Sequence, residues 1–188
     1  MSHDFNALLD NMVQPMHRAL VQHWLALFEV NGRQQLPGLH QIDAIAFGRY
    51  LPDICILDHE GGDRFVYRLA GGNVDDFYGQ PVKGRSMADL MDSPTRERLL
   101  DMAHAILKPP TAVMHGLSSM LPQWNYSVAL TRISLPLADR EGVARHIISA
   151  TVFRYDRDNS HAMVTADFQH RYRIPLPGED VAAQRSAG

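Results

Sequence analysis

The sequence predicts an α+β fold in which helices pack against an antiparallel β-sheet. Residues 64–70 alternate, with Phe65, Tyr67 and Leu69 on one side, as in a strand with one buried face. Residues 93–108 instead carry apolar side chains at helical spacing. Further strand-like runs follow at 111–120, 123–137 and 143–154, the last two joined by a hairpin turn. Strands on both sides of a helical segment indicate a mainly antiparallel sheet.

An N-terminal helix is predicted over 15–30, with Pro15 in its first turn and a stop at Asn31 and Gly32. Its apolar side chains cover more than half of the circumference, so they need two covering surfaces. These side chains belong to Met16, Leu20, Val21, Trp24, Leu25, Leu27 and Phe28. The second surface is either a second subunit or the rest of the same chain. We expect a homodimer through residues 16–28, because exposed aromatic residues of this size mark contacts.

After a loop at 32–50, a strand at 54–58 and the strand at 64–70 form a hairpin. A helical insert at 73–108 begins after Gly71 and Gly72, which allow a sharp turn out of the strand. The insert contains two short helical segments and then the long helix, which starts at Ser93-Pro94 and stops at Pro109-Pro110. Short helices cover a sheet incompletely, so this arrangement predicts a small pocket.

Three stretches carry a resemblance to a known family: YRLAGGNVDDFYG, VKGRSMADL and LPLADREGVARHIISATVF. They resemble PAS sensor domains, in particular a family of small bacterial single-domain PAS-like proteins. The resemblance covers roughly 33–154 and implies a five-stranded antiparallel sheet with helices on one face. We therefore expect an N-terminal helical extension at 1–32, a PAS-like domain at 33–155, and a partly disordered tail at 156–188.

Composition excludes several classes of protein. A net charge of −3 provides no basic surplus for nucleic-acid phosphates. No apolar run approaches the roughly 18 residues of a transmembrane helix, and the N-terminus lacks the pattern of a signal peptide. The single cysteine, Cys55, cannot form an internal disulfide. We therefore expect a cytoplasmic protein that neither binds nucleic acid nor inserts into a membrane.

Catalytic and metal-binding motifs are absent from the sequence. None of the ten histidines belongs to an HExxH pair. His104 lies off the apolar stripe of the long helix, so haem ligation is not expected, although a haem-loaded sensor remains an alternative. Cys55 lies in a strand and outside any flavin-photoreceptor motif. Asp75 and Asp76 are adjacent and diverge, and no GxSxG elbow supports a nucleophile.

The resemblance places a pocket between the helical insert and the inner face of the last strands. We expect it to be lined by Phe77, Tyr78, Met87, Leu90, Leu99, Met102, Ile106, Val128, Leu130 and Ile148. Each of these is also an ordinary core residue. Arg68 either holds an acidic ligand or faces water, and the second alternative is favoured. The predicted function is non-enzymatic: sensory or regulatory binding of a small molecule, a partner protein, or both. A dimerisation or adaptor module with a filled core is the main alternative. No fused output domain is expected, and the identity of any cofactor is unknown.

Overall fold

A computed structural model describes residues 2–4, 8–10, 12–121, 126–156 and 168–176 of the chain. In these residues seven strands form one sheet, in the order β1-β7-β4-β5-β6-β2-β3. The strands are β1 (Ser2–Asp4), β2 (Ile54–His59), β3 (Phe65–Ala70), β4 (Thr111–Leu121), β5 (Tyr126–Ala138), β6 (Ala144–Asp156) and β7 (Phe168–Arg173). The helices are α1 (Pro15–Val30), α2 (Gly72–Tyr78) and α3 (Ser93–Leu107), with 3-10 turns η2 (Leu39–Gln41), η3 (Ala44–Asp53) and η4 (Met87–Leu90).

The predicted α+β class is confirmed, but the sheet is wider than predicted. The five expected strands pair antiparallel as β4-β5-β6-β2-β3. The prediction that residues 54–70 and 111–154 supply all strands is wrong. Strand β7 pairs antiparallel with β4, and β1 pairs parallel with β7. The backbone groups along the outer edge of β4 need hydrogen-bond partners, and β7 supplies them.

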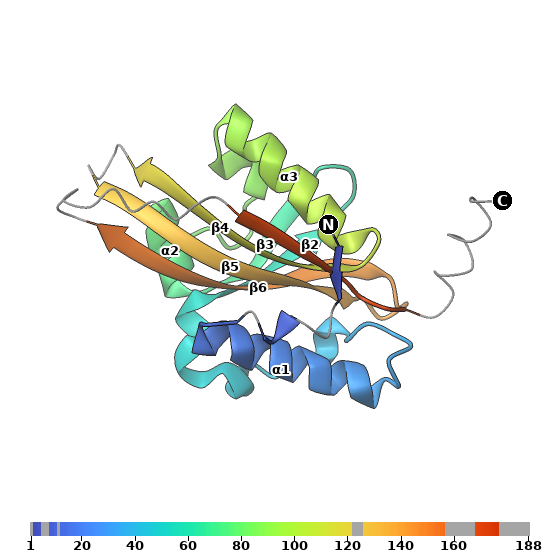
Figure 1. The fold of residues 1–188 in the computed structure, drawn as a ribbon. Helices are drawn as coiled ribbons and strands as arrows, with labels where there is room; N and C mark the ends of the chain where they lie inside the picture. The colour runs from blue at the N-terminus through green and yellow to red at the C-terminus, as the bar shows by residue number, and fades with distance from the viewer. Residues whose placement is uncertain (1, 5–7, 11, 122–125, 157–167, 177–188) are drawn as a thin grey trace.

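Helices cover both faces of the sheet rather than one. Figure 1 shows α3 on one side and α1 on the other, and Val74 of α2 packs in the same core as α3. On the α1 side, Trp24 and Phe28 pack in one core with Ile133 and Leu135 of β5. On the α3 side, Leu99 and Ile106 pack in a second core with Tyr67 and other residues of β2 and β3. We call these the α1-side core and the α3-side core. A strand alternates between its faces, so two cores require helices on both sides.

The prediction of an interface on α1 rested on a wrong premise. Trp24 and Phe28 are 0% and 1% exposed within the single chain. The Trp24 Nε1 donates a 2.8 Å hydrogen bond to the Pro136 carbonyl oxygen of β5. Phe47 of η3 covers the other side of α1, with its ring 5.1 Å from that of His23. The apolar side chains of α1 are thus covered within the single chain. A homodimer through residues 16–28 stays a prediction, but the apolar face of α1 no longer supports it.

A register shift changes the predicted faces of β3. The pairing of β2 with β3 slips between Ile56 and Leu57. As a result Phe65 and Tyr67 pack in the α3-side core, whereas Leu69 packs against the α1-side core. A β-bulge of this kind is not visible in the alternation of side chains.

Gly71 sets the entry into α2. A Cβ atom at this position would lie 2.3 Å from the carbonyl oxygens of Leu51 and Pro52, so only glycine fits. Gly79 ends the helix in the left-handed region, at φ 66°. The predicted helical insert at 73–108 is therefore confirmed, and it places α2 and α3 over the same face of the sheet.

Candidate functional site

A row of polar side chains crosses the middle of the sheet on its α3 side. Gln169 of β7 lies opposite His115 of β4, and His115 lies opposite Arg132 of β5. Arg132 in turn lies opposite Thr151 of β6. Directly opposed residues on one face of a sheet have Cβ atoms about 4.5–5.5 Å apart, so neighbouring side chains in this row are in contact range. We call these four residues the polar row.

Arg132 is a buried cation at the centre of the polar row. It is 7% exposed, and its Nε donates a 2.7 Å hydrogen bond to the Thr151 hydroxyl. None of the ion pairs among the described residues includes Arg132. Burial lowers its pKa, but Cys55, Tyr67 and Tyr78 outweigh this and raise it, so the guanidinium stays charged. A buried charge without a counter-charge is costly and calls for an explanation.

His115 lies beside Arg132 and is also buried. It is 5% exposed, and in the described part of the chain neither ring nitrogen has a hydrogen-bond partner. Burial and, to a smaller extent, the charges of Arg132, Arg98 and His17 together lower its pKa to about 3. The ring is therefore neutral near pH 7, with one donor and one acceptor unused. Buried polar groups in folded proteins are normally paired, so this ring points to a missing partner.

A pocket opens between α3 and the strands next to His115. Its volume is about 210 Å³, and its described lining residues are Arg98, Leu99, Met102, His115, Gly116, Leu117 and Gln169. We call it the α3 pocket. Its walls are partly apolar, and two members of the polar row form part of its lining. Sites for drug-sized ligands have volumes of about 300–1,000 Å³, so this pocket suits a smaller molecule.

Hydroxyl groups surround Arg132 on its other side. The Tyr67 and Tyr78 hydroxyl oxygens are 2.9 Å apart. Burial raises the pKa of both phenols, so both remain protonated at neutral pH. The Ser134 and Ser149 hydroxyls are 2.8 Å apart. The α3-side core thus combines an apolar shell with a polar centre.

The predicted pocket residues do not form one site. Tyr78, Met87, Leu90, Leu99, Met102 and Ile106 belong to the α3-side core or pack against it. Val128 and Leu130 are buried, and the ring of Phe77 stacks on Phe153 at 5.2 Å. Ile148 belongs to the α1-side core, so it cannot share a pocket with the others. Within the predicted set, Leu99 and Met102 line the α3 pocket, and ligand binding by any of them stays a prediction.

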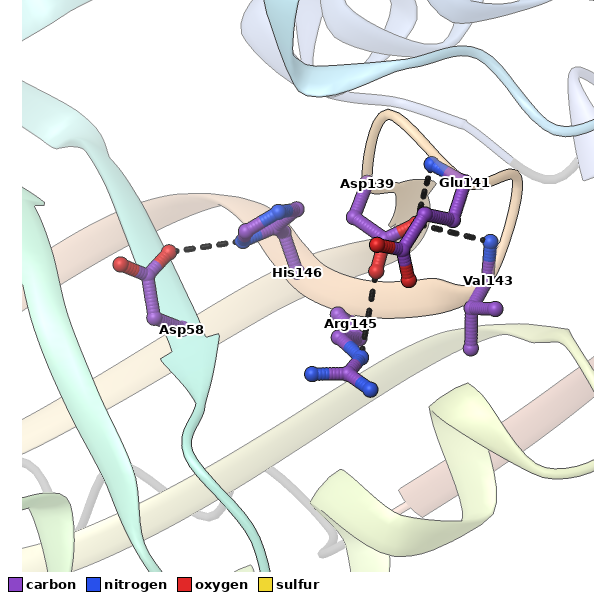
Figure 2. A network of polar contacts seen from close by, with 6 residues as sticks. All are labelled: Asp58, Asp139, Glu141, Val143, Arg145 and His146. Carbon is purple, nitrogen blue, oxygen red and sulfur yellow. Dashed lines mark hydrogen bonds and ion pairs between the residues drawn. The ribbon is translucent and has the colours of Figure 1, made fainter.

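Arg68 lies outside the pocket, on the surface. Its half-exposed guanidinium donates to the Asp58 carboxylate at 2.8 Å. Figure 2 shows that the same carboxylate also reaches His146, whose Nδ1 lies 2.7 Å from Asp58 Oδ1. In the neighbouring hairpin turn, Asp139 accepts from the backbone of Glu141 and Val143. Because Arg68 is paired within its own chain, the proposed role in holding an acidic ligand is not supported.

The contacts of His104, Cys55 and Asp75 indicate structural roles for these three residues. His104 is partly exposed, with its Nε2 2.9 Å from Asp63 Oδ1. It lines a surface groove with His59 and Lys108, separate from the α3 pocket. Burial raises the pKa of the Cys55 thiol, which makes it unreactive. Asp75 accepts a hydrogen bond from the Val82 backbone at 2.9 Å and so fixes the loop after α2.

The described residues support neither a metal-binding site nor a membrane-spanning helix. Their His, Cys, Asp and Glu side chains form no group of three or more that could bind a metal ion. The described helices include none with the length and apolar content needed to cross a bilayer.

Comparison with known proteins identifies the family. A family model described as "PAS domain" matches residues 12–151. Among curated proteins, none matches the chain. Solved structures with a similar fold include VqmA bound to DPO, at 16% identity and a TM-score of 0.47, covering 58% of this chain and 56% of that one. They also include the PAS domain of Bordetella pertussis BvgS, at 16% identity and a TM-score of 0.42, covering 62% and 90%.

The LOV protein of Rhodobacter sphaeroides matches at 11% identity and a TM-score of 0.42, covering 53% of this chain and 57% of that one. The match therefore spans little more than half the length of the VqmA and LOV chains. Identities of this size carry no information about ligands or partners. The family model, which spans most of the sheet and all of the helical insert, is sufficient: the chain belongs to the PAS domain family.

Proposed function

We propose that this PAS domain is a non-enzymatic sensory or regulatory module that binds a small molecule in the α3 pocket. The observation that carries the proposal is the buried ring of His115, which borders the pocket and has no partner among the described residues. A ligand in the pocket would supply that partner. The cytoplasmic location expected from the composition is part of this proposal.

Binding there would couple a ligand to the outer surface of the protein. The pocket is lined by Leu99 and Met102 of α3, by His115 of β4, and by Gln169 of β7. A ligand that touches all three elements favours the conformations in which they are packed together, and so shifts the population of α3 positions. A partner protein that contacts α3 would detect this shift.

Native mass spectrometry with a pocket-filling variant tests the proposal. We expect the protein isolated from its own cells to retain a small molecule, and Met102→Trp to lose it, because the indole occupies the pocket. The control is Asp101→Trp, which places the same indole on the exposed side of α3. If neither the wild type nor Asp101→Trp retains or binds any small molecule, the alternative of a ligand-free dimerisation or adaptor module is favoured.

A further inference from the structure

We infer that the α3 pocket binds a small uncharged molecule whose head group, a primary amide or an alcohol, forms hydrogen bonds with His115 and Gln169. This inference rests on the proposed function and adds the chemical class of the ligand. It depends on three features of the described residues: the unpaired ring of His115, the position of Gln169 beside it, and the charges and apolar side chains around the pocket.

The first feature is the unused hydrogen-bonding capacity of His115. Its ring is 5% exposed and borders the pocket, and neither ring nitrogen has a partner in the described part of the chain. The lowered pKa keeps the ring neutral at pH 7, so one nitrogen donates and the other accepts. A neutral imidazole carries its proton on either nitrogen, so the nitrogen that faces the pocket can pair with an acceptor or with a donor. A ligand head group would supply the partner that this buried ring lacks.

The second feature is Gln169 of β7, which lies directly opposite His115 and also lines the pocket. Directly opposed residues on one face of a sheet have Cβ atoms about 4.5–5.5 Å apart, so both side chains are close enough to contact one head group. The Gln169 amide has N–H donors and a carbonyl acceptor. A ligand amide or hydroxyl likewise donates and accepts, whereas a carboxylate only accepts and an ammonium only donates. An amide or an alcohol therefore matches both side chains.

The third feature begins with the charges around the pocket, which oppose a cationic ligand. Arg98 lines the pocket, and the positive charges of Arg98 and Arg132 both lower the pKa of His115. The ring therefore lies in a positive potential. The described lining contains neither aspartate nor glutamate that would offset this potential. An ammonium group beside His115 would be repelled.

The same surroundings do not form a site for an anion. Arg132 is not among the described lining residues, and its Nε donates to Thr151. Arg98 is exposed to solvent, which screens its charge, and the buried polar group of the lining, His115, is neutral. An anion would therefore lose its water shell without gaining a buried counter-charge, which is costly. An uncharged head group avoids both this loss and the repulsion of a cation.

The apolar part of the lining limits the rest of the ligand. Leu99, Met102 and Leu117 provide contacts for a carbon body. The volume of about 210 Å³ limits this body to a few carbon atoms or one small ring. The pocket therefore favours a compact apolar body that carries one uncharged polar group.

A matched series of probes tests the inference on the full chain. Benzamide, benzyl alcohol, benzoate, benzylammonium and toluene share one ring and differ in the head group. Butanamide, butan-1-ol, butanoate and butylammonium repeat the comparison on a smaller body. Binding is measured at pH 7 by isothermal titration calorimetry and by the shift in melting temperature. We expect an amide or an alcohol to bind about tenfold more tightly than the charged and apolar members of its series, as one additional hydrogen bond would produce.

Two variants remove the proposed partners of the head group. His115→Leu and Gln169→Leu should each weaken the binding of the amide or alcohol by about tenfold, whereas the affinity for toluene should not fall. Toluene thus separates the loss of a hydrogen bond from damage to the pocket. Gln169 is exposed, so Gln169→Leu keeps the inference testable if His115→Leu fails to fold. His40→Leu and Gln34→Leu make the same substitutions at exposed positions outside the described lining and should leave binding unchanged.

The outcomes distinguish the inference from the proposed function. Tightest binding of a charged probe, equal binding of toluene, or unchanged amide and alcohol affinity in a folded His115→Leu or Gln169→Leu would overturn the inference while leaving a ligand-binding pocket. Failure of every amide and alcohol to bind would overturn it as well, as would a molecule retained from cells that is charged at pH 7. Retention of a small molecule that Met102→Trp abolishes would still support the proposed function in those cases.

Discussion

At the scale of single residues, two buried histidines set the response of the protein to acid. His17 of α1 is 0% exposed, and burial lowers its pKa to about 4, although the Thr131 and Ala150 backbones raise it. His115 of β4 has a pKa of about 3, lowered mainly by burial. Both values lie below the 6.5 of an unperturbed histidine. The folded state therefore binds fewer protons than the unfolded state at mildly acidic pH, and stability falls as the pH decreases.

The first prediction concerns this acid sensitivity. The contribution of His17 is complete above pH 6.5 and is lost as the pH falls towards about 4. Within that window each buried histidine lowers the free energy of unfolding by about 1.4 kcal/mol per pH unit. His17→Met should remove one such contribution, which urea unfolding at pH 7.5, 6.5, 5.5 and 4.5 would reveal as a flatter profile. His40→Met, at an exposed position, serves as the control. Equal slopes for His17→Met and the wild type would contradict the burial of a neutral His17.

Single residues also mark the limit of what the sequence predicts about the site. The run 123–137 is recognisable as a strand, yet nothing local shows that Arg132 points into the protein rather than into water. The pairing of β4 with β5 decides this, because it places Arg132 beside His115 under α3. Apolar pocket residues such as Leu99 and Met102 were predictable from helical spacing. The polar centre was not predictable, because it depends on contacts between strands that are distant in the sequence.

At the scale of elements, α1 shows that the apolar pattern of a helix does not identify the surfaces that cover it. The spacing of Trp24, Leu25 and Phe28 predicts the helix correctly and shows that two surfaces must cover it. It does not show whether those surfaces come from one chain or two. The sheet covers one side of α1, and Phe47 of η3 packs beside it on the other. The loop predicted at 32–50 carries no strong structural signal, so this second covering surface was missed.

The second prediction follows from the position of α1. Phe28→Glu should unfold the protein or destabilise it by several kcal/mol, since it buries a carboxylate in the α1-side core, where a charge without a partner is costly. Ala26→Glu introduces the same charge at an exposed position of the same helix and should have little effect. Circular dichroism with urea unfolding measures both variants. If Phe28→Glu folds with normal stability and changes only the oligomeric state in sedimentation, the result would support the predicted dimer interface on α1.

At the scale of the whole molecule, β7 completes the structure from the C-terminal side. Its sequence, FQHRYR, is short and mostly polar, which explains why the sheet was predicted to be narrower. Tyr172 and the following Ile174 are nevertheless 1% and 0% exposed, and both belong to the α1-side core. The Ile174 backbone N–H donates to the Pro110 carbonyl oxygen at 3.2 Å. Pairing with β4 therefore places this segment within the fold, while the predicted domain boundary at 155 stays a prediction.

The third prediction compares two truncations of the chain. A protein that ends at residue 167 loses β7, leaves the edge of β4 unpaired, and removes the buried side chains of Tyr172 and Ile174. Loss of one large buried side chain costs about 2–5 kcal/mol, so the melting temperature should fall sharply. The exposed edge should also promote self-association, which size-exclusion chromatography would detect. A protein that ends at Leu176 keeps every contact described for β7 and should melt like the full chain. Gln169 of β7 lines the α3 pocket, so the shorter protein should also retain less small molecule in native mass spectrometry. Equal melting temperatures for the two truncations would show that β7 contributes nothing to the stability of the sheet.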